Sequence, residues 1–180
     1  MTTTQLINTS LKIIGENGFS GSAVAASNAQ AALEKLTHLS KHLSQKALHE
    51  LRRQQLIATS RDGGRIRFQL TTKGLHRLQR LRMNELSVPE PKKWDGHWRV
   101  VMFDVPTRHN RRRTNFTRIL KQMGFTMLRD SVWVYPHPCF DQLDEVTAYC
   151  GLQQFVTYAE INRLDNGSTA RLLRHYPTLQ

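Results

Sequence analysis

Hydrophobic residues recur at helical spacing three times in the first half of the chain. The first run predicts a short amphipathic helix that ends before Gly15, and it consists of Leu6, Ile7, Leu11, Ile13 and Ile14. A second helix is predicted over residues 29–39, and a third over residues 44–54 with Ser44 as its N-cap. In the third helix Ala47, Leu48 and Leu51 would face inward, which leaves a polar face outside.

After the third helix the hydrophobic period changes to that of a strand. Ile66, Phe68 and Leu70 alternate with polar residues, as in a strand that is buried on one face, and residues 56–59 supply its partner. The sequence Asp62-Gly63-Gly64 between them predicts a tight turn, because these residues tolerate positive φ. Thr71 or Thr72 would then cap a further helix.

The second half of the chain alternates strands and helices. Residues 98–105 are apolar on both faces, which is typical of a central strand. We expect a helix over 110–123, strands over 125–128 and 132–135, a helix over 141–150 that Gly151 ends, and a last strand over 154–161. This order predicts the split βαβ, or ferredoxin-like, plan. The fold class is therefore α+β.

Two prolines divide the chain. Pro89 and Pro91 prevent a helix and favour an extended connector over residues 87–93. We therefore expect a first domain over 1–86, a ferredoxin-like domain over 94–165, and a tail over 166–180 of which residues 170–175 could form one or two helical turns.

Three helices followed by a basic hairpin are the order of a winged helix-turn-helix, whose recognition helix needs an apolar face to seat it and a polar face for the major groove. The stretches 44–57 (SQKALHELRRQQLI) and 62–74 (DGGRIRFQLTTKG) resemble the winged-helix pattern of bacterial regulators. Each arginine considered alone is equally typical of a solvated helix end or of a charged hairpin edge. The residues expected to contact DNA are Ser44, Gln45, Lys46, His49, Arg52, Arg53, Arg61, Arg65 and Arg67.

Charge supports a polyanionic partner. The chain has 26 basic and 14 acidic residues, a net charge of +12, and the excess is shared by both halves. No apolar run is long enough to span a bilayer and no secretory signal opens the chain, so a cytoplasmic protein is expected. Cys139 and Cys150 are expected to be free thiols. His38, His42 and His49 lack the accompanying ligands of a zinc site.

The most distinctive stretch runs from Trp94 to Pro106 (WDGHWRVVMFDVP). With Gly124-Phe125 and residues 131–136 (SVWVYP), it resembles the PaaX family of transcriptional repressors over about residues 29–165. The resemblance implies a winged helix followed by a ferredoxin-like domain, which is similar to the CRISPR-associated endonuclease Cas-two. PaaX repressors carry a further C-terminal domain that we expect this chain to lack, so the sensing of a CoA thioester is not carried over.

The resemblance to Cas-two singles out Asp104, at the end of the first strand of the second domain. In a dimer, two such aspartates could hold Mg²⁺ and activate water for cleavage of a phosphodiester. The other interpretation is structural: an Asp at a strand end that accepts hydrogen bonds from backbone N–H groups. A single carboxylate makes a weak Mg²⁺ site, and this favours the structural interpretation.

A dense group of cations follows Asp104 at the start of a helix, where positive charge opposes the helix dipole. This placement indicates an anionic partner such as the DNA backbone, or a solvated turn, and the group is Arg108, Arg111, Arg112 and Arg113. The aromatic residues Trp94, Trp98, Trp133 and Tyr135 are expected in the core or at a dimer interface.

The sequence thus predicts a homodimeric repressor of transcription that binds double-stranded DNA and needs no cofactor. The alternative is a Cas-two-like, Mg²⁺-dependent endonuclease or a subunit of a spacer-integration complex. A nonspecific DNA-binding protein is a third possibility.

Overall fold

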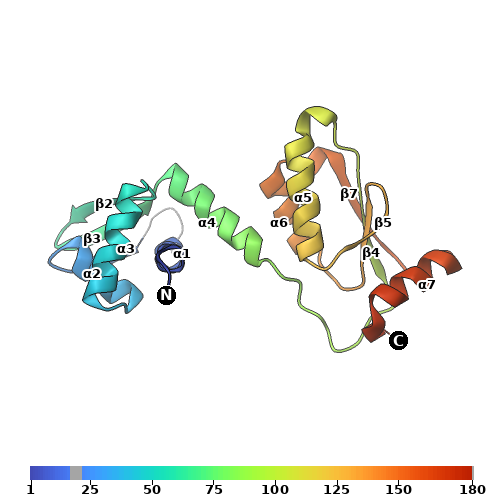
Figure 1. Ribbon diagram of the computed structural model, residues 1–180, viewed down its shortest axis with the longest axis horizontal. Helices are drawn as coiled ribbons and strands as arrows, with labels where there is room; N and C mark the ends of the chain where they lie inside the picture. The colour runs from blue at the N-terminus through green and yellow to red at the C-terminus, as the bar shows by residue number, and fades with distance from the viewer. Residues whose placement is uncertain (17–21, 180) are drawn as a thin grey trace. The chain divides into compact units, whose positions relative to one another are not determined.

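The computed structural model describes residues 1–16 and 22–179. These residues form two compact units, Met1–Arg82 and Met83–Gln180, which are drawn in Figure 1 from blue to red along the chain. The division falls within the last turn of the helix Thr72–Glu85, a few residues before the predicted connector at 87–93. Leu78 of this helix is buried in the core of the first unit, and Met83 is buried in the core of the second.

The first unit contains four helices and three strands within its described residues. They are α1 (Thr3–Gly15), β1 (Ser22–Ala25), α2 (Ala29–Thr37), α3 (Lys41–Arg53), β2 (Ile57–Asp62), β3 (Arg65–Leu70) and α4 (Thr72–Glu85). The strands form an antiparallel sheet in the order β1-β3-β2. Strand β1 was not predicted, because its four residues are too few to show a strand period.

Helix α3 begins earlier than predicted. Its N-cap is Ser40, whose Oγ accepts a hydrogen bond from the backbone N–H of Leu43. The predicted cap, Ser44, lies inside the helix, is fully buried, and donates a hydrogen bond from its Oγ to the carbonyl of Leu39. Both serines are suitable caps in isolation, and packing against the neighbouring helices decides between them.

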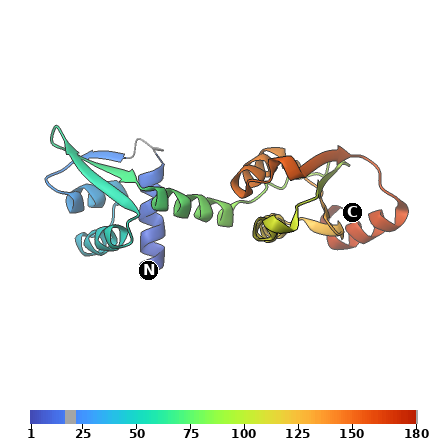
Figure 2. The same ribbon diagram turned by 90° about the horizontal axis from the view of Figure 1, so that it is seen from above.

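The hairpin of β2 and β3 forms as predicted. Gly63 and Gly64 both have positive φ, at 49° and 78°, which is the backbone of a tight hairpin turn. Ile66 and Phe68 are buried on the inner face of β3, while Arg65 is exposed on the other. Figure 2 shows the tip of the hairpin projecting beyond the helices of this unit.

The second unit is built on a four-stranded antiparallel sheet. Its elements are β4 (Trp98–Phe103), α5 (Asn110–Gln122), β5 (Thr126–Arg129), β6 (Val132–Tyr135), α6 (Phe140–Cys150), β7 (Val156–Ile161) and α7 (Asn166–His175), with short 3₁₀ turns at Thr107–His109, Gln153–Phe155 and Pro177–Leu179. The strand order is β5-β6-β4-β7, so β4 is central as predicted. The order of strands and helices is the predicted split βαβ plan.

The two faces of this sheet are covered by different helices. Helices α5 and α6 pack on the face of Val101 and Trp133, and α7 packs through Leu172 on the face of Trp98 and Val134 (Figure 1). The predicted tail therefore begins with a ten-residue helix that closes a core, and Asp165 caps it by accepting a hydrogen bond from the N–H of Ser168. The sequence showed only part of this helix, since its apolar face is short.

Two further expectations concern membranes and thiols. No helix within residues 1–16 and 22–179 is both long and apolar enough to cross a membrane. Cys139 and Cys150 are free and buried, and burial raises the pKa of their thiols to about 12 and about 11. Both thiols are therefore protonated at neutral pH and behave as core side chains.

The glycine at the first turn of α4 makes a testable contact. Gly74 lies so close to the end of α3 that a Cβ there would be 1.9 Å from the backbone oxygen of Leu56. We expect Gly74→Ala to lower the free energy of unfolding by about 2 kcal/mol, because backbone atoms must move to admit the methyl group. Urea unfolding would measure the change. Thr72→Ala, an exposed position in the same helix, is the matched control and should have little effect.

Candidate nucleic-acid interface

Helix α3 presents a polar face from a firmly seated position. Ala47, Leu48 and Leu51 are buried, and only three residues, 38–40, separate α3 from α2. His38 takes a left-handed backbone conformation, with φ of 54°, which allows this short connection. The exposed residues of α3 include five that were predicted from the sequence: Gln45, Lys46, His49, Arg52 and Arg53.

The side chains on this face differ in how far they are already paired. Gln45 and Lys46 make no hydrogen bond or ion pair within the described part of the chain, so their polar groups are available to a partner. Arg52 donates from Nη2 to Oγ1 of Thr59 on β2, at 2.8 Å. The free pair lies toward the N-terminal half of α3, which is the part of a recognition helix that contacts base edges.

Arg53 has an acidic partner that the sequence did not reveal. Its guanidinium donates from Nε and Nη2 to the carboxylate of Glu50, with an Nη2–Oε2 distance of 2.8 Å. Gln54 also donates to Glu50. Hydrogen bonds from Arg53 and then Gln54 lower the pKa of Glu50, and the same contact with Glu50 raises the pKa of Arg53. Arg53 therefore brings little free charge to this face.

Ser44 does not belong to this surface. The sequence placed it among the DNA-contacting residues as the helix cap, but its side chain is fully buried and directed at the α2–α3 turn. The expectation for Ser44 was wrong because α3 begins one turn earlier, at Ser40.

The three arginines of the hairpin differ in their exposure and in their hydrogen bonds. Arg65 is exposed at the start of β3, and Arg67 is half-buried two residues later on the same face. Arg61 donates from Nη2 to the backbone oxygen of Ser27 at 2.9 Å, which links β2 to the segment before α2. Arg61 and Arg65 are both exposed to solvent.

The arginines in the turn before α5 and in its first turn make different contacts. Arg112 donates to the carbonyl of Gly151, where the C-terminus of α6 carries partial negative charge. Arg113 donates to Oγ of Ser131 and lies 5.8 Å from the ring centre of Phe103. Arg108 contacts the ring of His109, and Arg111 is exposed. The group is therefore partly explained by contacts within the unit.

Asp104 follows β4 and is exposed. Its backbone N–H donates to the carbonyl of Phe155, while its side chain has no hydrogen bond or ion pair with the described residues. The backbone N–H contacts that the structural interpretation requires are thus not present. Within the described residues, no three His, Cys, Asp or Glu side chains are grouped as metal ligands would be. Among residues 1–16 and 22–179, Asp104 is therefore not part of such a group of three ligands.

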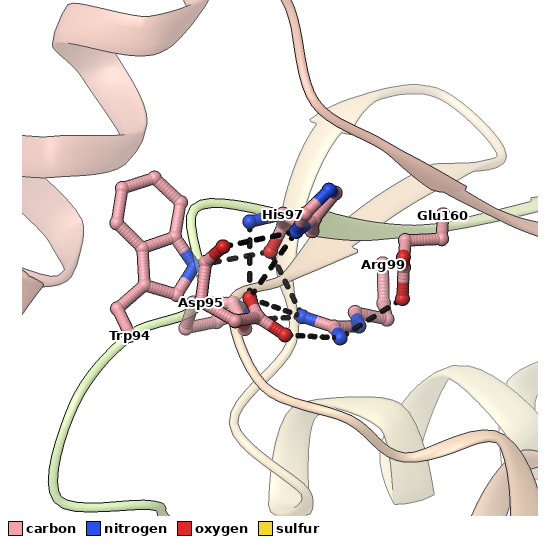
Figure 3. A network of polar contacts seen from close by, with 6 residues as sticks. Trp94, Asp95, His97, Arg99 and Glu160 are labelled. Carbon is pink, nitrogen blue, oxygen red and sulfur yellow. Dashed lines mark hydrogen bonds and ion pairs between the residues drawn. The ribbon is translucent and has the colours of Figure 1, made fainter.

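The distinctive stretch after residue 94 forms a buried polar network, which Figure 3 shows. Arg99 is 3% exposed, and its guanidinium donates to both carboxylate oxygens of Asp95, at 2.9 and 2.6 Å. It also contacts the carboxylate of Glu160 on β7 at 2.9 Å and the carbonyls of His97 and Pro136 at 3.0 Å. One buried cation thereby joins the loop before β4 to β7 and to the end of β6.

The aromatic residues of this stretch pack in the cores of the second unit. Trp98, Trp133 and Tyr135 are buried, as predicted. Trp94 is half-buried, lies 4.8 Å from Trp98 between ring centres, and donates from Nε1 to the carbonyl of His97. Residues 94–99 of the stretch that is most distinctive in sequence therefore have a structural role.

Sequence reasoning missed a second group of exposed cations. Arg171 and Arg174 lie on α7, and Arg129 lies at the end of the edge strand β5. Arg171 and Arg174 are far from β5 in the sequence and lie beside its residues 126–128 because α7 packs against this strand. Asp165 followed by Leu172 and Leu173 was the available signal for a capped amphipathic helix.

The Asp95–Arg99 pair generates a prediction about acid stability. Hydrogen bonds from Arg99, as the main cause, lower the pKa of Asp95 from 3.8 to about 2. Because the folded pKa is depressed, the stabilisation is present above about pH 4 and is lost as the pH falls toward 2. The Asp95 side chain is 39% exposed, so we expect screening by water to limit its contribution to about 1 kcal/mol.

Urea unfolding of Asp95→Asn at about pH 7 and about pH 3 tests this expectation. The variant should be less stable than the wild type at neutral pH, and it should lose less further stability on acidification. Asp130→Asn, which removes an exposed carboxylate from a turn of the same unit, is the control. Equal pH dependence in wild type and Asp95→Asn would contradict the assignment.

Comparison with known proteins identifies the second unit. The family model described as the PaaX protein central Cas2-like domain matches residues 91–173, a range that includes the whole four-stranded sheet and most of α7. A search of curated proteins finds no match. The match extends beyond the predicted domain end at 165, in agreement with the packing of Leu172 against the sheet. Residues 91–173 are therefore similar to the central, Cas2-like domain of PaaX proteins.

Proposed function

We propose that this PaaX-like protein is a transcriptional regulator that binds duplex DNA as a homodimer and acts as a repressor in the cytoplasm without a cofactor. Residues 1–86 are proposed to form its winged helix-turn-helix, joined through residues 87–93 to the Cas2-like domain. The observation that carries the proposal is the exposed polar face of α3, held in place by a fully buried apolar face on the same helix.

The arrangement of the first unit supports this assignment. A three-residue turn joins α2 to α3, and an antiparallel hairpin follows α3 directly. A helix of this kind can enter the major groove only if its outer face carries hydrogen-bonding groups that are not engaged elsewhere. Gln45 and Lys46 meet this requirement, since neither has a partner in the described structure.

The hydrogen bonds within α3 suggest which of its side chains contact bases and which contact phosphates. Gln45 and Lys46, with His49 beside them, are proposed to contact base edges, because an amide can bind adenine in a bidentate manner and an ammonium can bind guanine. Arg52 is held by Thr59 on β2 and is proposed to contact a phosphate. Arg53, engaged by Glu50, is proposed to make the weakest contribution.

The hairpin is proposed to act as the wing. Arg65 and Arg67 lie on the solvent face of β3. Arg61 lies on β2, where it pairs with Ile66 of β3. From a projecting hairpin these cations can reach a phosphate or a narrow minor groove. The arginines at 108 and 111–113 are proposed to add contacts to the DNA backbone, since each retains donors that its internal contact does not use.

A substitution in α3 tests the proposal. Gln45→Ala combined with Lys46→Ala should abolish the enrichment of a defined sequence when bound duplexes are selected from a random pool. It should also reduce affinity for the sequence that the wild type selects by about 100-fold, since each base contact is worth about 1–3 kcal/mol. Gln79→Ala combined with Arg80→Ala removes the same kinds of side chain from exposed positions of α4 and is the matched control.

Two results would contradict the proposal. The first is an unchanged selected sequence in the α3 variant, which would show that another surface reads the bases. The second is Mg²⁺-dependent cleavage of duplex DNA that Asp104→Asn abolishes, which would favour the Cas-two-like nuclease.

The oligomeric state provides a separate prediction. A twofold symmetric dimer places two identical α3 helices on two half-sites, so the selected sequence should be an inverted repeat with centres about 10 base pairs or a multiple apart. Light scattering should give twice the chain mass of 20.8 kDa for the free protein. A monomer that selects a single, asymmetric half-site would overturn this part of the proposal.

A further inference from the structure

We infer that the C-terminal helix of the Cas2-like domain and the adjoining edge strand form a second DNA-binding surface, which holds the phosphate backbone without reading sequence. This α7–β5 surface consists of Arg129, Arg171, Arg174 and His175, all of them exposed. The inference rests on the proposed function, because it assumes that the protein binds DNA. It assigns a role to cations that lie outside the proposed recognition helix and wing.

The surface is hollowed rather than flat. A depression of about 280 Å³ lies between β5 and α7, and its walls contain no acidic residue. The residues that line it are Thr126, Met127, Arg171, Leu172, Arg174 and His175. A concave site lined by guanidinium groups and free of carboxylates is suited to an anionic ligand.

The cations are mounted on a rigid support. Leu172 is 1% exposed in the core beneath α7. Just after the helix, the hydroxyl of Tyr176 donates to the carbonyls of Gly124 and Val134, at 2.7 and 2.9 Å. Arg171 itself donates to the carbonyl of Leu128 on β5, which fixes its guanidinium at the edge of the sheet. Such fixing reduces the entropy that would be lost on binding.

Interactions within the Cas2-like domain explain only some of the cations of the α7–β5 surface. Cations in the last turn of a helix are stabilised by the helix dipole, and this explains Arg174 and His175. It does not explain Arg129, which belongs to another element and has no partner within the described residues. The acidic residue nearest in sequence to α7, Asp165, is engaged at its N-terminus by Ser168. Among the described residues, no acidic residue lines the depression beside Arg171 and Arg174.

The phosphate backbone fits these features better than a base does. The cations come from a helix and from a neighbouring strand, so they are not gathered on the polar face of one recognition helix. Met127 is 54% exposed beside them and offers apolar contact to the sugars between phosphates. Contacts of this kind add affinity and salt dependence that are independent of sequence.

The salt dependence of DNA binding by the full chain tests the inference. Arg171→Gln combined with Arg174→Gln should reduce the slope of log K against log salt by about two, measured on a mixed-sequence duplex of about 30 base pairs between about 50 and 200 mM salt. Arg174→Gln alone, which breaks no internal contact, should reduce the slope by about one. Both variants should weaken binding to selected and random duplexes by the same factor.

Lys92→Gln combined with Lys93→Gln removes two exposed charges from the same unit and is the matched control. It should leave the slope unchanged. A wild-type slope in Arg174→Gln, or an equal reduction in the lysine control, would overturn the inference while leaving the α3 assignment intact. Failure of the wild type to bind any duplex would overturn both the inference and the proposed function.

Discussion

A shortage of acidic partners constrains the whole chain. With 26 basic and 14 acidic residues, many cations cannot be neutralised within the fold, wherever the side chains lie. The positions at which carboxylates do meet cations are therefore informative. Asp95 and Glu160 surround the buried guanidinium of Arg99, and Glu50 holds Arg53 at the end of α3. Cations without such partners remain at the surface, where an external anion can neutralise them.

This distinction separates the cations that are paired within the fold from those that an external anion could neutralise. The network around the buried Arg99 lies in the stretch that is most distinctive in sequence, and its contacts give residues 95–99 a structural role. It joins three segments of the Cas2-like domain, and a buried cation of this kind is costly unless its hydrogen bonds are complete. By contrast, Gln45 and Lys46 carry polar groups that no contact within the first unit explains.

The proposed roles in base reading and phosphate binding follow from whether each side chain is already hydrogen-bonded within the fold. An exposed and unpaired face on α3 suits sequence reading, because hydrogen bonds to bases require donors that are not already engaged. Arginines that are anchored by one internal hydrogen bond and exposed at the solvent suit phosphate contacts, since position matters there more than selectivity. Arg52 and Arg171 share this pattern in different units of the chain.

Periodicity alone predicted the helices and strands that have a long apolar face. Ala47, Leu48 and Leu51 were correctly assigned inward, and the order of elements in the second half was correct, because burial imposes a period of 3.6 or 2 on the sequence. Strand β1 and the first four residues of α7 escaped prediction, since four residues or one short apolar face carry little periodic signal. Ser44 was assigned to the cap of α3 although Ser40 occupies it.

The sequence by itself determined the two-part organisation, the excess of positive charge and the polar face of α3, because these depend on composition and local spacing. Only the tertiary structure decided which cations are paired. It brought Glu50 onto Arg53, and Asp95 and Glu160 onto Arg99. It also placed the cations of α7 beside strand β5. Electrostatic interactions act through space and fall with distance, so the charge that a surface offers to DNA depends on packing and cannot be counted along the chain.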